Sequence, residues 1–165
     1  MIRPSVKEDI TAIMAIIEET ILDMRTYGNT QWDESYPTEA VFLEDIEKKN
    51  LFTYEENGEV GGIICVNTIE PNEYAEVTAW RQQGVAMVVH RVAIAMKMRK
   101  KGIATQLLTF AEQVAAEKGI PYLKTDTYSV NSKMNTLFSK LGYKLCGTIH
   151  FMGREKEFNC YDKEL

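Results

Sequence analysis

The chain has 165 residues, of which 45% are hydrophobic and 26% charged, with 10 glycines and only 4 prolines. This composition is typical of a soluble globular protein and excludes a disordered tail or a disulfide-rich scaffold. Charge is divided unevenly: residues 1–84 carry a net charge of −11 and residues 85–165 one of +6, which gives −5 overall. A net acidic protein lacks the positive field on which general nucleic-acid and membrane-surface binders depend, so we expect neither as a partner.

The N-terminus has no sign of an export signal. Its first residues contain no apolar stretch typical of a signal peptide, and no run in the chain approaches the roughly 18 apolar residues of a membrane span. The cysteines Cys65, Cys146 and Cys160 are widely spaced and form no CxxC pair, so neither a disulfide framework nor a zinc site is predicted. We therefore expect a cytoplasmic protein with buried thiols and no metal.

The chain begins with two predicted helices. Ser5 and Glu8 have the spacing of a capping box, and apolar residues then recur at helical spacing, which predicts a helix over about 6–25. After a loop, Thr38 is expected to cap a second, acidic helix that ends near Lys48.

Strands follow the second helix. Segments 51–54 and 60–68 flank Asn57-Gly58, a dipeptide that favours the positive φ values of a tight hairpin turn. The segment 69–84 is irregular in pattern, and 85–96 is long and rich in Val, Ile and Ala, which predicts a central strand buried on both faces.

The last third predicts two further helices and three strands. A third helix runs between Gly102 and Gly119, a strand covers 122–128, a fourth helix covers 131–141, and a hairpin occupies 143–162. The resulting order, βααβββαβαββ, mixes hairpins with two βα crossovers. It predicts an α/β or α+β fold with a mixed sheet.

A basic segment, Lys97-Met98-Arg99-Lys100-Lys101, lies where the central strand meets the third helix. Cations are unfavourable at a helix N-terminus by about 0.3–1 kcal/mol each. An anion bound to the free N–H groups of 101–105 would offset that cost, although a solvated basic turn explains the segment equally well. The P-loop and dinucleotide-binding patterns are both absent, so an NTP or NAD site lacks its usual support.

Two motifs of this region resemble those of the GNAT superfamily of N-acetyltransferases. Arg99, Gly102 and Ala104 match [Arg/Gln]-x-x-Gly-x-[Gly/Ala], directly after a predicted strand and at the start of a helix. Residues 131–143 are similar to the family's N-x-x-x-x-x-L-Y-x-K-x-G-[F/Y] segment. The resemblance implies that residues 1–165 form a single GNAT domain with a mixed, splayed β-sheet flanked by helices.

The resemblance also implies an activity: acetyl-CoA-dependent N-acetyl transfer to a primary amine of a small molecule or peptide, by direct attack on the thioester. Acetyl-CoA would lie in the gap between the strands at 85–96 and 122–128. The carried-over cofactor positions are the backbones of Val92, Ala93 and Ile94 for the pantetheine and acetyl carbonyl, the backbones of Arg99, Lys100, Lys101, Gly102, Ile103, Ala104 and Thr105 for the pyrophosphate, and Asn131 for the pantetheine arm. Asn131 is also expected to cap the fourth helix.

The usual proton donor of the family is missing. The tyrosine of its fourth helix aligns with Phe138, which has no hydroxyl group. Tyr128 is then the nearest candidate in the sequence, and a thiolate leaving unaided is an alternative because a thiol pKa near 8.5 makes a fair leaving group. A catalytically silent module that binds or senses acyl-CoA is the alternative function.

His90 is the first candidate for the general base. It precedes Val92 by two residues, hence lies on the same face of an extended strand, and imidazole titrates near neutral pH. A packed structural histidine is the competing interpretation, and Glu73, Glu76 or a chain of waters are alternative bases.

In this superfamily the acceptor amine is selected in part by the loop after the first helix. Trp32, Glu34 and Tyr36 in that loop offer a carboxylate and aromatic faces to a cationic amine, although ordinary surface and core roles explain such residues too. Arg91 and Asp126 are expected to pair across neighbouring strands. The identity of the amine and the formation of a homodimer through edge strands are left open.

Overall fold

The computed structural model of the chain describes residues 1–165 and contains seven strands and four α-helices. The strands are hydrogen-bonded in the order β1-β2-β3-β4-β5-β7-β6. This mixed α/β fold with an open sheet confirms the predicted class. The elements are β1 (Ile2–Pro4), α1 (Ile10–Arg25), α2 (Glu39–Glu47), β2 (Leu51–Glu56), β3 (Glu59–Asn67), β4 (Met87–Ile94), α3 (Ile103–Glu117), β5 (Tyr122–Tyr128), α4 (Ser132–Lys140), β6 (Lys144–Ile149) and β7 (Phe158–Glu164), with short 3-10 turns η1 (Lys7–Asp9), η2 (Asn72–Glu76) and η3 (Met96–Met98).

The chain divides into two compact units. The first contains Met1–Val66 and His90–Ala111, and the second contains Asn67–Val89 and Glu112–Leu165. Strand β4 contributes its first residues to the second unit and its remainder to the first. That the whole chain forms one domain stays a prediction. None of the helices is both long and apolar enough to cross a membrane.

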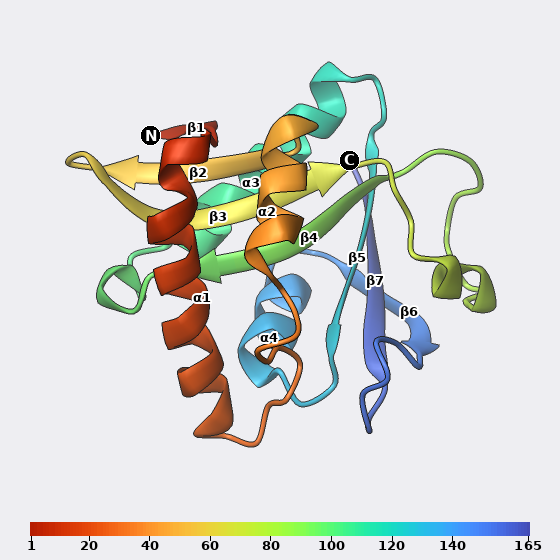
Figure 1. Cartoon of the computed structure of the whole chain (residues 1–165). Coiled ribbons are helices and arrows are strands. Elements are labelled where there is room, and N and C mark those ends of the chain that lie inside the picture. The colour runs from red at the N-terminus through yellow and green to blue at the C-terminus, as the bar shows by residue number, and fades with distance from the viewer. The chain divides into compact units, whose positions relative to one another are not determined.

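The first unit consists of antiparallel strands covered by helices. Strand β2 pairs with β1 and β3, with Ile2 opposite Tyr54 and Leu51 opposite Cys65. Figure 1 shows α1 and α2 crossing in front of β2 and β3, with α3 behind them. On the α3 side, the Phe52 ring meets the ring of Phe110 edge-on at 4.8 Å between centroids.

Local sequence signals in this unit were correct where their partners are close in the chain. The Thr38 hydroxyl accepts the Val41 N–H at 3.4 Å and caps α2, as predicted. Asn57 and Gly58 have φ values of +53° and +76°, so they form the predicted turn between β2 and β3.

The predicted capping box at the first helix was wrong. The Ser5 hydroxyl instead lies 2.6 Å from the Thr53 hydroxyl of β2. The Asp9 carboxylate accepts the Val6 N–H at 2.8 Å and pairs with Arg3 at 2.8 Å. The turn that starts the helix is therefore closed one residue later than the Ser-x-x-Glu pattern suggests, because Ser5 has a partner in the sheet.

The second unit is built around β5, β7 and β6. Strand β7 is antiparallel to both neighbours, with Asp126 opposite Cys160. Met87–Val89 of β4 pair in parallel with β5, and this register ends at Val89 opposite Thr125. The Asn131 side chain accepts the Met134 N–H at 3.2 Å, which confirms the predicted cap of α4.

Candidate functional site

The loop between η3 and α3 has the backbone of an anion site. Lys100 and Gly102 both adopt left-handed conformations, with φ values of +64° and +76°. The Gln106 N–H donates to the Gly102 carbonyl at 3.0 Å and closes the first turn of the helix. The N–H groups of 103–105 precede this bond and so have no partner within the helix, which leaves them able to donate to a phosphate.

The Arg99 side chain ties this loop to α1. Its guanidinium donates to the Asp23 carboxylate at 2.6 Å, approaches the Thr20 hydroxyl at 3.5 Å, and donates through Nε to the Ile94 carbonyl at 3.2 Å. The arginine of the motif thus connects the end of β4, the loop and the helix. Its structural contribution in this chain is to shape the loop through three internal contacts.

The lysines of the loop are largely neutralised by neighbouring carboxylates. Lys97 forms an ion pair with Glu59, and Lys101 lies 3.9 Å from the Glu56 carboxylate at the end of β2. Lys100 is exposed and makes no ion pair. Of the three lysines, Lys100 is therefore the one whose ammonium group is left for a bound anion.

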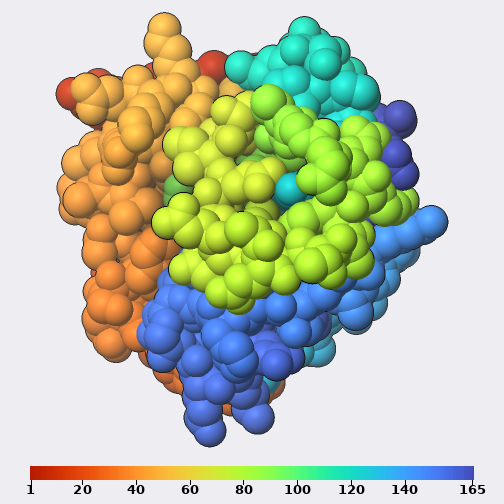
Figure 2. Space-filling view, turned by 90° about the vertical axis from the view of Figure 1, so that its right-hand side faces the viewer, coloured from red at the N-terminus to blue at the C-terminus, as the bar shows by residue number.

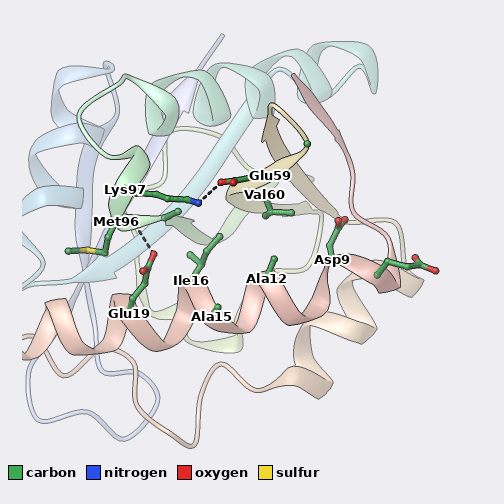
Figure 3. Close-up of a pocket in the computed structure, with 12 residues that line it drawn as sticks. Asp9, Ala12, Ala15, Ile16, Glu19, Glu59, Val60, Met96 and Lys97 are labelled. Carbon is green, nitrogen blue, oxygen red and sulfur yellow. Dashed lines mark hydrogen bonds and ion pairs between the residues drawn. The ribbon is translucent and has the colours of Figure 1, made fainter.

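A groove of about 710 Å³ lies in the first unit beside this loop (Figure 3). Its floor is formed by small and apolar side chains of α1, among them Ala12 and Ile16, together with Val60 of β3. The Glu19 carboxylate at one end accepts the Met96 N–H of η3 at 2.7 Å. Glu19 thus fixes the turn that precedes the loop, and none of the residues predicted for catalysis lines this groove.

The end of β4 lies close against glycines of β3. A Cβ atom at Gly62 would come within 3.1 Å of the Ala93 carbonyl and 2.9 Å of the Ile94 Cδ1. The Ala95 N–H donates to the Gly61 carbonyl at 2.9 Å. Gly62 is explained by this approach of two backbones, since a glycine inside a strand often marks such a contact, whereas a Cβ atom at Gly61 would meet the Met98 side chain.

Arg91 interrupts β4 and does not pair with Asp126, contrary to our expectation. Its φ is +46°, a left-handed value that is rare for a residue other than glycine. Its guanidinium binds both oxygens of the Asp45 carboxylate at 2.8 and 2.7 Å and donates to the Tyr36 hydroxyl at 2.9 Å. The ion pair is buried, with side-chain exposures of 13% and 8%.

The left-handed residue also affects the argument for His90. We placed His90 and Val92 on one face because side chains two apart share a face of an extended strand. That alternation does not carry across a residue at φ +46°, so the spacing no longer supports the shared face. Both residues are partly buried, and a catalytic role for His90 stays a prediction.

The three predicted acceptor residues differ in environment. Trp32 is only 5% exposed, and its carbonyl accepts a hydrogen bond from Arg25 at 2.8 Å, so it serves as core of the loop. Glu34 is exposed. Tyr36 is partly buried, with its hydroxyl bound to Arg91. Of the three, Glu34 is the one whose side chain is fully available to a ligand.

In the second unit, Asp126 is a carboxylate with a raised pKa, which the sequence did not reveal. The Tyr74 hydroxyl donates to its carboxylate at 2.5 Å. Burial raises the pKa of Asp126, the hydrogen bond from Tyr74 lowers it and the charge of Glu73 raises it, which together give a pKa of about 6. A carboxylate with a pKa near 6 is matched to accepting a proton at neutral pH.

Tyr74 belongs to a segment that covers this face of β5 and β7. Figure 2 shows residues 67–84 on the surface, next to the C-terminal hairpin. Lys124 binds Glu70 at 2.8 Å and lies 4.4 Å from the centre of the Trp80 ring. Arg81 binds the fully buried carboxylate of Asp162 at 2.6 Å. Polar contacts at both ends therefore hold Tyr74 over Asp126.

Tyr128, the predicted proton donor, is buried in the second unit. Its ring packs on Phe158 at 4.9 Å, and its hydroxyl oxygen accepts the Lys156 N–H at 3.0 Å. Phe138 of α4 is also buried and lies between the rings of Tyr143 and Tyr161. The position expected to hold a tyrosine hydroxyl therefore belongs to an aromatic core.

Comparisons with known proteins agree with this fold. The model of the acetyltransferase (GNAT) family matches residues 16–143. A GNAT-family acetyltransferase from Streptococcus agalactiae 2603 is 25% identical with a TM-score of 0.87, over 100% of this chain and 95% of its own. The PaiA N-acetyltransferase from Thermoplasma acidophilum, determined with coenzyme A, is 18% identical with a TM-score of 0.73, over 100% and 98%. The yncA protein from Salmonella typhimurium, determined with acetyl-CoA, is 18% identical with a TM-score of 0.73, over 100% and 93%.

The comparison with curated proteins gave no match. Because the family model covers most of the sequence, the chain belongs to the acetyltransferase (GNAT) family. The structure contains no group of three or more His, Cys, Asp or Glu side chains suited to a metal ion.

Proposed function

We propose that this protein transfers the acetyl group of acetyl-CoA to a primary amine of a small molecule or peptide. The observation that carries the proposal is the loop at 99–105, whose left-handed residues and unpaired helix N–H groups suit a pyrophosphate, in a chain of the acetyltransferase (GNAT) family. Two similar structures, those from Salmonella typhimurium and Thermoplasma acidophilum, contain acetyl-CoA or coenzyme A.

The chain's own residues supply binding along the length of this co-substrate. The backbone of 99–105 holds the pyrophosphate, the backbone of 92–94 binds the pantetheine and the acetyl carbonyl, and Asn131 binds the pantetheine arm. The supporting geometry for the second contact is the close seat of Ala93 on Gly62, which fixes this backbone without side-chain contacts. Backbone N–H groups held in this way stabilise charge that develops on a carbonyl oxygen.

The proton of the amine passes to a general base, for which the chain offers two candidates. The amine nitrogen attacks the acetyl carbonyl carbon, its N–H proton passes to the base directly or through one water, and the carbon–sulfur bond breaks. His90, two residues before Val92 in the sequence, is the first candidate. Asp126 is the second, because a pKa of about 6 keeps its carboxylate ionised at neutral pH.

The leaving thiolate receives its proton from Tyr128 or from water. Tyr128 is the candidate for the first route because it carries the hydroxyl group that Phe138 lacks. Departure of the unprotonated thiolate is the alternative, since a thiol pKa near 8.5 allows it.

The cofactor is tested by thermal shift and the reaction by thiol release. A ligand that binds only the folded state stabilises it by RT ln(1+[L]/Kd), so acetyl-CoA should raise Tm more than ATP or NAD at equal concentration. Free thiol is then measured with polyamines, amino acids, aminoglycosides and peptides as acceptors. His90→Ala and Asp126→Asn distinguish the two candidate bases. The variant that lacks the actual base should have a lower kcat and should lose the acidic limb of the pH profile.

A second function is favoured by one observation. Phe138 occupies the position of the family's tyrosine hydroxyl and is packed between two aromatic rings. A module that binds acyl-CoA without turnover has no need of that hydroxyl. Tight binding of acetyl-CoA combined with no thiol release across the acceptor panel would support this function in place of catalysis.

A further inference from the structure

Arg91 combines two unusual features at one position of β4. Its backbone is left-handed, with φ +46°, within an otherwise extended strand. Its side chain forms a buried, two-pronged ion pair with Asp45 of α2 and a bond to the Tyr36 hydroxyl. The guanidinium also lies 3.4 Å from the Cys65 sulfur of β3. Three separate segments of the first unit therefore contact this one side chain.

A left-handed conformation of a residue other than glycine persists only where the surroundings enforce it. The residues before and after Arg91 belong to an extended strand, and without its tertiary contacts Arg91 would favour the extended conformation too. The Asp45 and Tyr36 contacts are the specific interactions that hold the side chain, since a guanidinium and a carboxylate bound through two bonds allow one relative orientation.

The residue that follows is Val92, which begins the backbone assigned to the acetyl carbonyl. The other end of this stretch is held by the Arg99 bond to the Ile94 carbonyl and by the Ala95 bond to Gly61. Arg91 is the corresponding attachment at the beginning. A change of its φ turns the peptide that joins it to Val92, and with it the Val92 N–H.

We propose that Arg91 is a positioning residue, whose ion pair with Asp45 holds the backbone of Arg91 in its left-handed conformation and thereby orients the Val92 N–H toward the acetyl group. This inference rests on the acetyl-CoA binding proposed above. The Arg91 side chain contacts the loop that carries Tyr36, and its backbone leads into the acetyl-binding residues. One residue thus positions both the acceptor loop and the acetyl group.

The test compares two double variants that differ by one methyl group. Both carry Asp45→Asn, so that no unpaired charge is buried, and one carries Arg91→Gly and the other Arg91→Ala. Glycine adopts a positive φ freely, whereas alanine does so only against strain. Isothermal titration with acetyl-CoA and with CoA gives the ratio of the two affinities, which measures recognition of the acetyl group alone.

We expect the wild-type protein and the glycine variant to prefer acetyl-CoA over CoA, and the alanine variant to lose that preference by about fivefold. Affinity for CoA itself should be equal in the two variants. Equal preferences in the glycine and alanine variants, or no preference in the wild type, would overturn the proposal. Failure of the wild type to bind either compound would instead overturn the proposed function.

If neither double variant unfolds cooperatively, the single variant Asp45→Asn replaces them in the test, because asparagine keeps the shape of the side chain. It should weaken the preference for acetyl-CoA without changing the affinity for CoA. An unchanged preference in this single variant would also overturn the proposal, because the anchor of Arg91 would then be unnecessary.

Discussion

Replacing Gly102 by alanine tests whether the loop backbone holds the pyrophosphate. Gly102 has a φ of +76°, and no atom lies within 4 Å of the place where a Cβ would stand. The substitution therefore introduces backbone strain and no steric clash. Gly58, in the turn between β2 and β3, has the same φ of +76° and the same empty surroundings, so Gly58→Ala is a matched control.

The size of the effect follows from the left-handed conformation. An L-residue there costs about 1 kcal/mol relative to glycine. A turn that keeps its conformation shows this cost as a Tm lower by about 2–4 °C in a chain of this length, which we expect for Gly58→Ala. At Gly102 the loop of the free protein instead releases the strain by relaxing. Binding must then restore the left-handed conformation, so up to the same 1 kcal/mol is lost from the binding free energy, which corresponds to about fivefold in Kd.

The measurement is a calorimetric titration of CoA into each variant at one fixed salt concentration, with Tm recorded in parallel. Gly102→Ala should bind CoA about fivefold more weakly than the wild type, while Gly58→Ala should lose thermal stability but retain the affinity. Gly102→Asn should lie between, because asparagine tolerates the left-handed region. Equal CoA affinity in the two alanine variants would refute the role assigned to the loop backbone.

Three further changes test other parts of the structure. Asp126→Asn should raise Tm above pH 6 and have little effect near pH 4. The folded-state pKa of Asp126 is raised to about 6, so the wild-type fold is favoured when this carboxyl is protonated and loses that stability as pH rises through 6. Thermal melts across this pH range measure the profile. Arg81→Met leaves the buried Asp162 carboxylate without its cation and should destabilise the fold by about 3 kcal/mol in urea unfolding; a change below 0.5 kcal/mol would contradict this. In Gly62→Ala the new methyl group meets the backbone of β4, which should lower the free energy of unfolding by about 1–3 kcal/mol. In Gly61→Ala it meets the flexible Met98 side chain of η3 and should lower the free energy of unfolding less. Urea unfolding of the two variants measures the difference.

Features that depend on residues close in the chain could be predicted from the sequence. The cap at Thr38, the turn at Asn57-Gly58 and the cap at Asn131 were all correct. Each is closed within four residues, so its partner lies inside the pattern itself. The Ser5 cap was wrong because Thr53, distant in sequence, competes for the hydroxyl.

The partners of buried charges could not be predicted in this way. Asp45 is 46 residues from Arg91, and Tyr74 is 52 residues from Asp126. We expected Arg91 and Asp126 to pair because they carry opposite charges on strands that we placed side by side. Two closer partners exist instead, one on α2 and one in the irregular segment, and neither has a periodic pattern that fixes its place. The same error hid the raised pKa of the Asp126 carboxylate.

The uneven distribution of charge acquires a different meaning in the structure. The basic loop lies in the same unit as much of the acidic half, where Asp23, Glu56 and Glu59 bind three of its cations. The acidic half is therefore not simply a surface that attracts an amine, since part of its charge stabilises the loop. If the loop binds pyrophosphate, it does so chiefly through oriented N–H groups, with Lys100 as its free cation. Recognition then depends on the conformation at Gly102 more than on net charge, which is why a single methyl group there is a sharper test than removal of a lysine.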